Sequence, residues 1–123
     1  MLELDFDFTA DLLRRAERNN LVKAELQNGR SVGFRSSGWS LYPRVCSGDS
    51  CTYQPVVNAD DEIQKEDIVL CEVQPGNRFS AHIVKKIEDW EGRRCFTIAN
   101  YAGRENGWCY SEHIYGKLIH AEQ

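Results

Sequence analysis

The sequence lacks any apolar run of about 18 residues, so it predicts no transmembrane helix. Its first residues, Met1–Asp5, are acidic and lack the basic start and apolar centre of a secretory signal peptide. From these two absences we expect a cytoplasmic chain with no membrane partner.

A concentration of positive charge is also missing. The chain has 15 Lys and Arg against 19 Asp and Glu, which gives a net charge of −4. The basic residues are dispersed, and Arg14-Arg15 and Arg93-Arg94 are pairs rather than patches. Nucleic-acid binding depends on a positive surface, so we expect no nucleic-acid partner. With 123 residues, the chain is expected to form a single domain over residues 1–123.

One short segment, constrained by glycine and proline, carries a serine. Residues 38–43 read Gly-Trp-Ser-Leu-Tyr-Pro, which places Ser40 in a predicted turn. Further along the chain, Lys85 lies in an apolar, strand-like run, Ile83–Ile87. A serine hydroxyl is a weak nucleophile until a base takes its proton, and lysine acts as that base where burial disfavours its ammonium form. The pair predicts a hydrolase with a Ser40–Lys85 dyad.

Several segments resemble, in the same order, the superfamily of LexA-type self-cleaving repressors, UmuD-like proteins and type I signal peptidases. The matching segments are Gly38-Trp39-Ser40 with Pro43, Gly48-Asp49, Asp67-Ile68-Val69-Leu70, Val84-Lys85-Lys86-Ile87 and Gly116-Lys117-Leu118-Ile119. Leu41 stands where the family usually has Met, and Glu66 stands where it has Gly. Ile98–Arg104 replaces the Gly-Asp-Asn box of signal peptidases, and Gly38 carries no hydroxyl, so the chain looks more like the repressor branch.

The resemblance assigns roles to individual residues. Ser40 is the implied nucleophile and Lys85 the implied base, with Lys86 expected on the opposite face of the strand. Gly38, Trp39 and Leu41 are assigned to the support of the oxyanion and of the cleft. The structural turns are assigned to Pro43, Gly48, Asp49 and Asp67. No metal or cofactor is expected.

The resemblance implies a serine endopeptidase that uses a Ser-Lys dyad on an extended protein or peptide substrate. Self-cleavage is disfavoured, because the only Ala-Gly pair, Ala102-Gly103, lies C-terminal to both dyad residues. Two alternatives stay open from the residues alone. The turn is also typical of a structural loop, and a lysine pair is typical of a solvated strand face. The alternative function is an inactive peptidase-like domain that binds peptides or forms a homodimer through its terminal strand.

The five cysteines are odd in number and scattered, at positions 46, 51, 71, 95 and 109. This pattern predicts free thiols in a reducing compartment. Cys51 is close in sequence to Ser40, and among the cysteines it is the candidate for reactivity. A zinc site assembled from residues distant in sequence stays open as an alternative.

The predicted fold is mainly β: a bent antiparallel structure like that of LexA and signal peptidases, with one N-terminal helix. Thr9 is expected to cap a helix over about 9–19, followed by a β-rich body over about 21–120. Leu21–Leu26 alternates like a strand, and Asn28-Gly29 is typical of a hairpin turn. Tyr101–Glu112 and Asn58–Glu66 are expected to be loops, the first with the option of a short helix.

Overall fold

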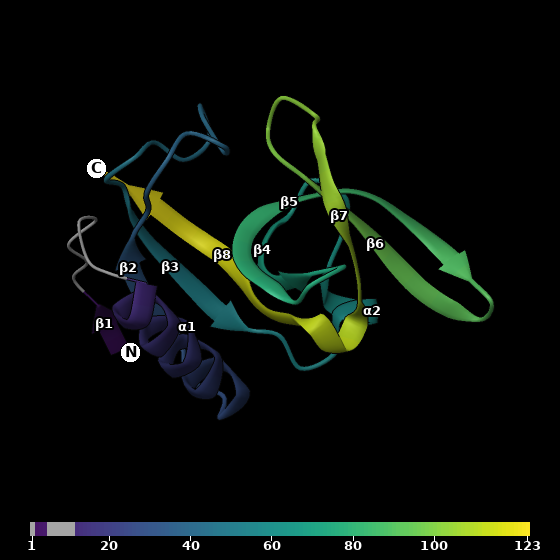
Figure 1. Ribbon diagram of the computed structural model, residues 1–123, viewed down its shortest axis with the longest axis horizontal. Coiled ribbons are helices and arrows are strands. Elements are labelled where there is room, and N and C mark those ends of the chain that lie inside the picture. The colour runs from purple at the N-terminus through teal and green to yellow at the C-terminus, as the bar shows by residue number, and fades with distance from the viewer. Residues whose placement is uncertain (1, 5–11) are drawn as a thin grey trace.

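The computed structural model describes residues 2–4 and 12–123, and these form one eight-stranded sheet with a helix beside it (Figure 1). The sheet order is β1-β2-β3-β8-β4-β5-β6-β7, and each neighbouring pair is antiparallel except β1 with β2. The strands are β1 (Leu2–Leu4), β2 (Val32–Arg35), β3 (Ser50–Pro55), β4 (Ile68–Val73), β5 (Arg78–Trp90), β6 (Arg93–Ala99), β7 (Glu105–Tyr110) and β8 (Ile114–Glu122). The prediction of a mainly antiparallel β-structure with one N-terminal helix is therefore confirmed.

The long strand β5 bends strongly (Figure 1), and its side chains contribute to two separate hydrophobic cores. Its first part pairs with β4 and its second part with β6. Since side chains alternate across a strand, Leu70 of β4 and Ile83 of β5 face a first core, while Val69 and Val84 face a second. The first core is closed by the helix, and the second fills the space enclosed by β4, β5, β6 and β7.

The N-terminal helix, α1 (Leu12–Gln27), is displaced from its predicted span of about 9–19. The segment Leu21–Leu26, predicted as a strand, belongs to this helix. Val22 and Leu26 are both buried in the first core, and their spacing of four places them on one helical face. A short alternating run fits either a strand or a helix. The helix forms here because it buries Val22 and Leu26 against the sheet. The predicted cap at Thr9 lies outside the described residues.

The Asn28-Gly29 pair, predicted as a hairpin turn, instead ends the helix. Gly29 has a φ of +80°, which favours glycine. Its N–H donates to Leu26 O at 3.1 Å, and the next N–H, from Arg30, donates to Glu25 O at 2.9 Å. These two bonds form a Schellman motif, which satisfies carbonyls that the helix end leaves without partners.

We expect Gly29→Ala to lower the free energy of unfolding by about 1–2 kcal/mol, because a Cβ disfavours this left-handed conformation. Among residues 2–4 and 12–123, nothing lies within 4 Å of a Cβ built there, so the loss is conformational and not steric. Urea denaturation measures it. Gly29→Asn is the matched control, and it should lose less because asparagine tolerates this conformation. Equal losses in both variants would contradict the explanation.

The segments predicted as loops contain further elements. Residues 101–112 include β7 and the start of a 3₁₀ helix (Ser111–His113). Gly107 resembles a turn residue in the sequence, but the strand needs it for a close approach, since a Cβ there would lie 2.1 Å from Gln74 O. The expected loop at 58–66 contains the short α2 (Ala59–Glu62), which Asn58 caps by accepting from Asp60 N–H at 3.1 Å. None of the helices among the described residues is both long and apolar enough to cross a membrane.

Candidate functional site

The loop that carries Ser40 connects β2 to β3 and is closed at its own base. Ser36 N–H donates to Asp49 O at 2.8 Å, and Gly48 N–H donates back to Ser36 O at 3.0 Å. The Ser36 hydroxyl adds a bond to Cys46 O at 2.6 Å. Asp49 is almost fully buried, and its Oδ2 accepts from Cys46 N–H at 2.8 Å. The loop is therefore held by a hydrogen-bonded stem.

Within the loop, one buried side chain fixes the turn and leaves its neighbours exposed. Leu41 packs into the first core, at 7% exposure. Gly38, with a φ of +81°, provides the bend that precedes it. Ser40, Trp39 and Tyr42 are exposed, and the two aromatic rings pack edge to face at 5.6 Å. Pro43 is also exposed, on the same turn.

Ser40 lines a groove of about 290 Å³ that also contains a histidine. The groove is bounded by α1, the end of β2 with its loop, and the strands β3, β4 and β5. His82 of β5 also lines it, although His82 alternates with Ala81 and Ile83, which pack in the first core, and pairs with Val69, which faces the second. His82 Nδ1 lies 2.9 Å from Ser80 Oγ, two residues earlier on the same strand. Burial lowers the pKa of His82 below its ordinary value of 6.5, and the nearby Arg78 guanidinium lowers it further.

The strand segment around His82 is paired on one side only. Residues from Arg78 to His82 pair with β4, whereas β6 begins to pair with β5 at Ile83, opposite Ala99. A strand with an unpaired edge presents backbone N–H and C=O groups that can bond to an extended peptide. This open edge of β5 lies in the segment that lines the groove.

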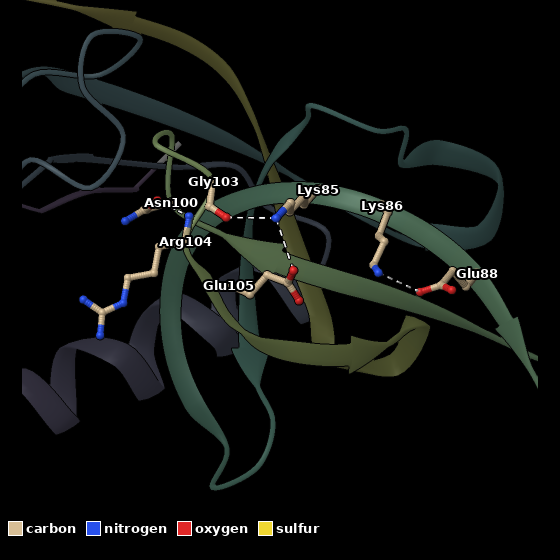
Figure 2. A network of polar contacts seen from close by, with 7 residues as sticks. All are labelled: Lys85, Lys86, Glu88, Asn100, Gly103, Arg104 and Glu105. Atoms are coloured by element: carbon tan, nitrogen blue, oxygen red, sulfur yellow. Dashed lines mark hydrogen bonds and ion pairs between the residues drawn. The ribbon is translucent and has the colours of Figure 1, made fainter.

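Lys85 lies further along β5, at a bulge (Figure 2). Val84 pairs with Ile98 and Lys86 pairs with Thr97, so Lys85 is the extra residue between them. Its Nζ donates to Gly103 O at 2.9 Å and to Glu105 Oε2 at 3.1 Å. The predicted alternation of Lys85 and Lys86 is wrong, because the bulge breaks it and both residues line one shallow pocket.

The loop between β6 and β7 contacts Lys85 through Gly103 (Figure 2), and it also contacts Ser40. Asn100 Oδ1 accepts from Arg104 N–H at 2.9 Å, and Gly103 N–H donates to Asn100 O at 3.0 Å. Tyr101 N–H of this loop donates to Ser40 O at 2.7 Å. The structure thus brings Ser40 and Lys85 to the same loop. Among the described residues, however, the ammonium group has Gly103 and Glu105 as its hydrogen-bond partners, not the serine hydroxyl.

The turn before β4 contains one position that matches the motif, Asp67, and one that departs from it, Glu66. Asp67 Oδ2 accepts from Gln64 N–H at 2.8 Å and lies 3.4 Å from Lys117 Nζ. Glu66 has a φ of +80°, a conformation that favours glycine, and glycine is what the resembling motif carries there. Both features define a tight turn that positions β4.

Sequence reasoning missed His82. The available signal was its place three residues before Lys85 on one strand. Histidine also needs less perturbation than lysine to act as a base, because its ordinary pKa is close to neutral. Among the described residues, no group of three or more His, Cys, Asp or Glu side chains could hold a metal ion.

All five cysteines are free, as predicted. The choice of Cys51 as the reactive thiol is wrong, because burial raises its pKa to about 11 and the Asp49 carboxylate adds to the rise. Cys46 alone is partly exposed. We expect a thiol reagent at pH 8 to modify Cys46 in the native protein well before the others, and all five after denaturation. Rapid native labelling of Cys51, located by peptide mass mapping, would contradict this order.

Comparison with known proteins adds no relative: no family model, no curated protein and no solved structure matches this chain. The functional assignment therefore depends on the motifs and on the geometry of the groove.

Proposed function

We propose that this chain is a serine peptidase that cleaves a peptide bond in an extended substrate, with Ser40 as the nucleophile. The observation that carries the proposal is the shared groove, which Ser40 and His82 line together. A nucleophile, a base and a third group that orients the base are the recurring parts of such sites. Here the orienting group is the Ser80 hydroxyl at His82 Nδ1.

His82 has the protonation state that a base needs. Because burial and Arg78 lower its pKa, the imidazole is neutral at pH 7. When Nδ1 carries the proton and donates to Ser80 Oγ, the lone pair of Nε2 is available to accept the Ser40 proton. The groove thus supplies a neutral base without a metal ion or cofactor.

The reaction then follows from these groups. Nε2 takes the Ser40 proton as Oγ attacks the substrate carbonyl, and backbone N–H groups at the turn stabilise the oxyanion. The imidazolium gives its proton to the leaving amine, which releases the first product and leaves an acyl-serine. A water molecule, deprotonated by His82, attacks the acyl group and restores Ser40. The substrate lies extended along the open edge of β5.

Lys85 remains the alternative base that the sequence predicts. To act in that way, its amine must leave Gly103 O and Glu105 and lose its proton before it reaches Ser40. The described contacts include no bond between His82 and Ser40 either, so the imidazole must also come within reach of the serine, but it needs no loss of a proton at pH 7, and we therefore assign it the role of base within this proposal.

The second candidate function is peptide binding without cleavage. Exposed aromatic side chains support it, because Trp39, Tyr42 and Tyr101 line a second pocket beside Ser40. The predicted dimerisation strand, β8, lies between β3 and β4 and is not an edge of the sheet, so the open edge of β5 is the better place for a partner.

A fluorophosphonate probe separates the two functions. Covalent labelling of Ser40, located by mass spectrometry, is expected for the peptidase. A protein that binds an extended peptide but is not labelled at Ser40 would support the binding function instead.

A further inference from the structure

The groove has a charge opposite to that of the chain as a whole. Two arginines line it, Arg18 from α1 and Arg35 from the end of β2. Among the described residues, no Asp or Glu lines this groove, although the chain has a net charge of −4. A third arginine, Arg78, lies close enough to lower the pKa of His82. An anionic ligand would therefore be attracted to this part of the surface.

The same groove has an apolar floor. Buried side chains from four elements form it, namely Val22, Leu41, Val45, Tyr53 and Leu70. Ser36 and Asn19 add hydrogen-bonding groups around this floor. Such a surface fits a segment that combines an apolar side chain with an acidic one.

The two arginines are held in place by the fold. Arg35 Nη1 donates to Gly48 O at 3.1 Å, which ties the guanidinium to the stem of the Ser40 loop. A guanidinium has five N–H donors, so others remain for a carboxylate. Arg18 precedes the buried Val22 by one helical turn, and this spacing directs it to the groove.

We propose that the groove selects substrates with an aspartate or glutamate close to the scissile bond, through Arg18 and Arg35. This inference rests on the proposed peptidase function. Arginine pairs with carboxylates through short, charge-assisted bonds that are about twice as strong as neutral ones. Both arginines line the same groove as Ser40, so the selected side chain belongs to the part of the substrate that lies in this groove.

The test uses three fluorogenic peptides that differ only at one position near the cleaved bond, with Glu, Gln or Lys there. We expect kcat/KM for the Glu peptide to exceed that for the Gln peptide about tenfold, with the Lys peptide cleaved most slowly. The preference should decrease as salt is raised from 50 mM toward about 1 M, where the Debye length is about 3 Å. Equal cleavage of the Glu and Gln peptides overturns the inference and leaves the peptidase function intact.

A variant with reversed charge in the groove distinguishes loss of substrate recognition from loss of the folded structure. In Arg18→Glu, the Lys peptide should become a better substrate than the Glu peptide, a result that loss of structure cannot produce. Arg35→Gln should lose most of the Glu preference. Arg94→Gln is the matched control, since Arg94 lies on β6 and donates to Asp60 O outside the groove. A Glu preference unchanged in both groove variants contradicts the assignment.

Peptide binding by the Ser40→Ala variant distinguishes a failure of the proposed peptidase function from a failure of the proposed acidic preference. If the wild-type chain cleaves none of the peptides, fluorescence anisotropy of the same labelled peptides still measures selection. Tighter binding of the Glu peptide than of the Lys peptide then supports the acidic preference while the peptidase function fails. Equal binding of both overturns the preference as well.

Discussion

Ser40→Ala is expected to abolish labelling by the fluorophosphonate probe and to lower the rate of peptide hydrolysis by about 10⁴-fold or more. The reason is chemical, because no other group replaces the nucleophilic oxygen. Ser40 is exposed on a turn that Leu41 anchors, so removal of one hydroxyl should change the free energy of unfolding by no more than about 0.5 kcal/mol. Progress curves and urea denaturation measure the two effects.

Ser37 provides the matched control for this variant. It lies in the same loop, is exposed and lines the same groove. Ser37→Ala should keep most of the activity and all of the labelling. Similar losses in both variants would show that the loop, and not the Ser40 hydroxyl, is responsible.

His82→Gln is expected to lower kcat by about 10²–10⁴-fold, the range typical of a lost general base. In the wild-type chain, kcat/KM should rise with pH along one titration with its midpoint below 6.5. The sign follows from the environment: burial and Arg78 disfavour the imidazolium, and the other charged groups lining the groove, Arg18 and Arg35, are also cationic. The same shift makes the fold less stable as the pH falls below 6.5, because unfolded His82 binds a proton more strongly than folded His82.

Lys85→Ala tests the rival base. If His82 is the base, this variant loses only the contacts to Gly103 and Glu105, and its pH profile keeps the same midpoint. Lys86→Ala is the control, since Lys86 pairs with Glu88 at 3.6 Å instead. Abolished activity in Lys85→Ala alone, with a profile that rises only in the alkaline range, would return the role of base to Lys85.

The sequence predicted the β-rich character of the body, and the strand-like run Ile83–Ile87 lies within β5. The errors lie where local patterns have two meanings. Asn28-Gly29 fits a hairpin or a helix end, and the choice depends on whether Val22 and Leu26 find a core to pack against. Gly107 fits a turn or a close strand contact, and the choice depends on Gln74, which is distant in sequence.

Part of the candidate site could be predicted from the sequence. Gly38 and Leu41 define the turn that presents Ser40, and both are local signals. The partner of Ser40 is not a local property. The segment of β5 that lines the groove pairs with β4 and precedes the pairing with β6, and the bulge at Lys85 lies beyond it; neither feature can be derived from alternation.

The division of β5 between two cores has a consequence for how the chain unfolds. Ile83 and Val84 are adjacent in sequence but are buried in different cores, so β5 cannot leave one core without disturbing the other. The two halves should therefore unfold in a single cooperative transition. A peptide bound along the open edge of β5 would stabilise both halves of the fold at once. Its binding should therefore increase the protection of β6 and β7 amides from hydrogen exchange.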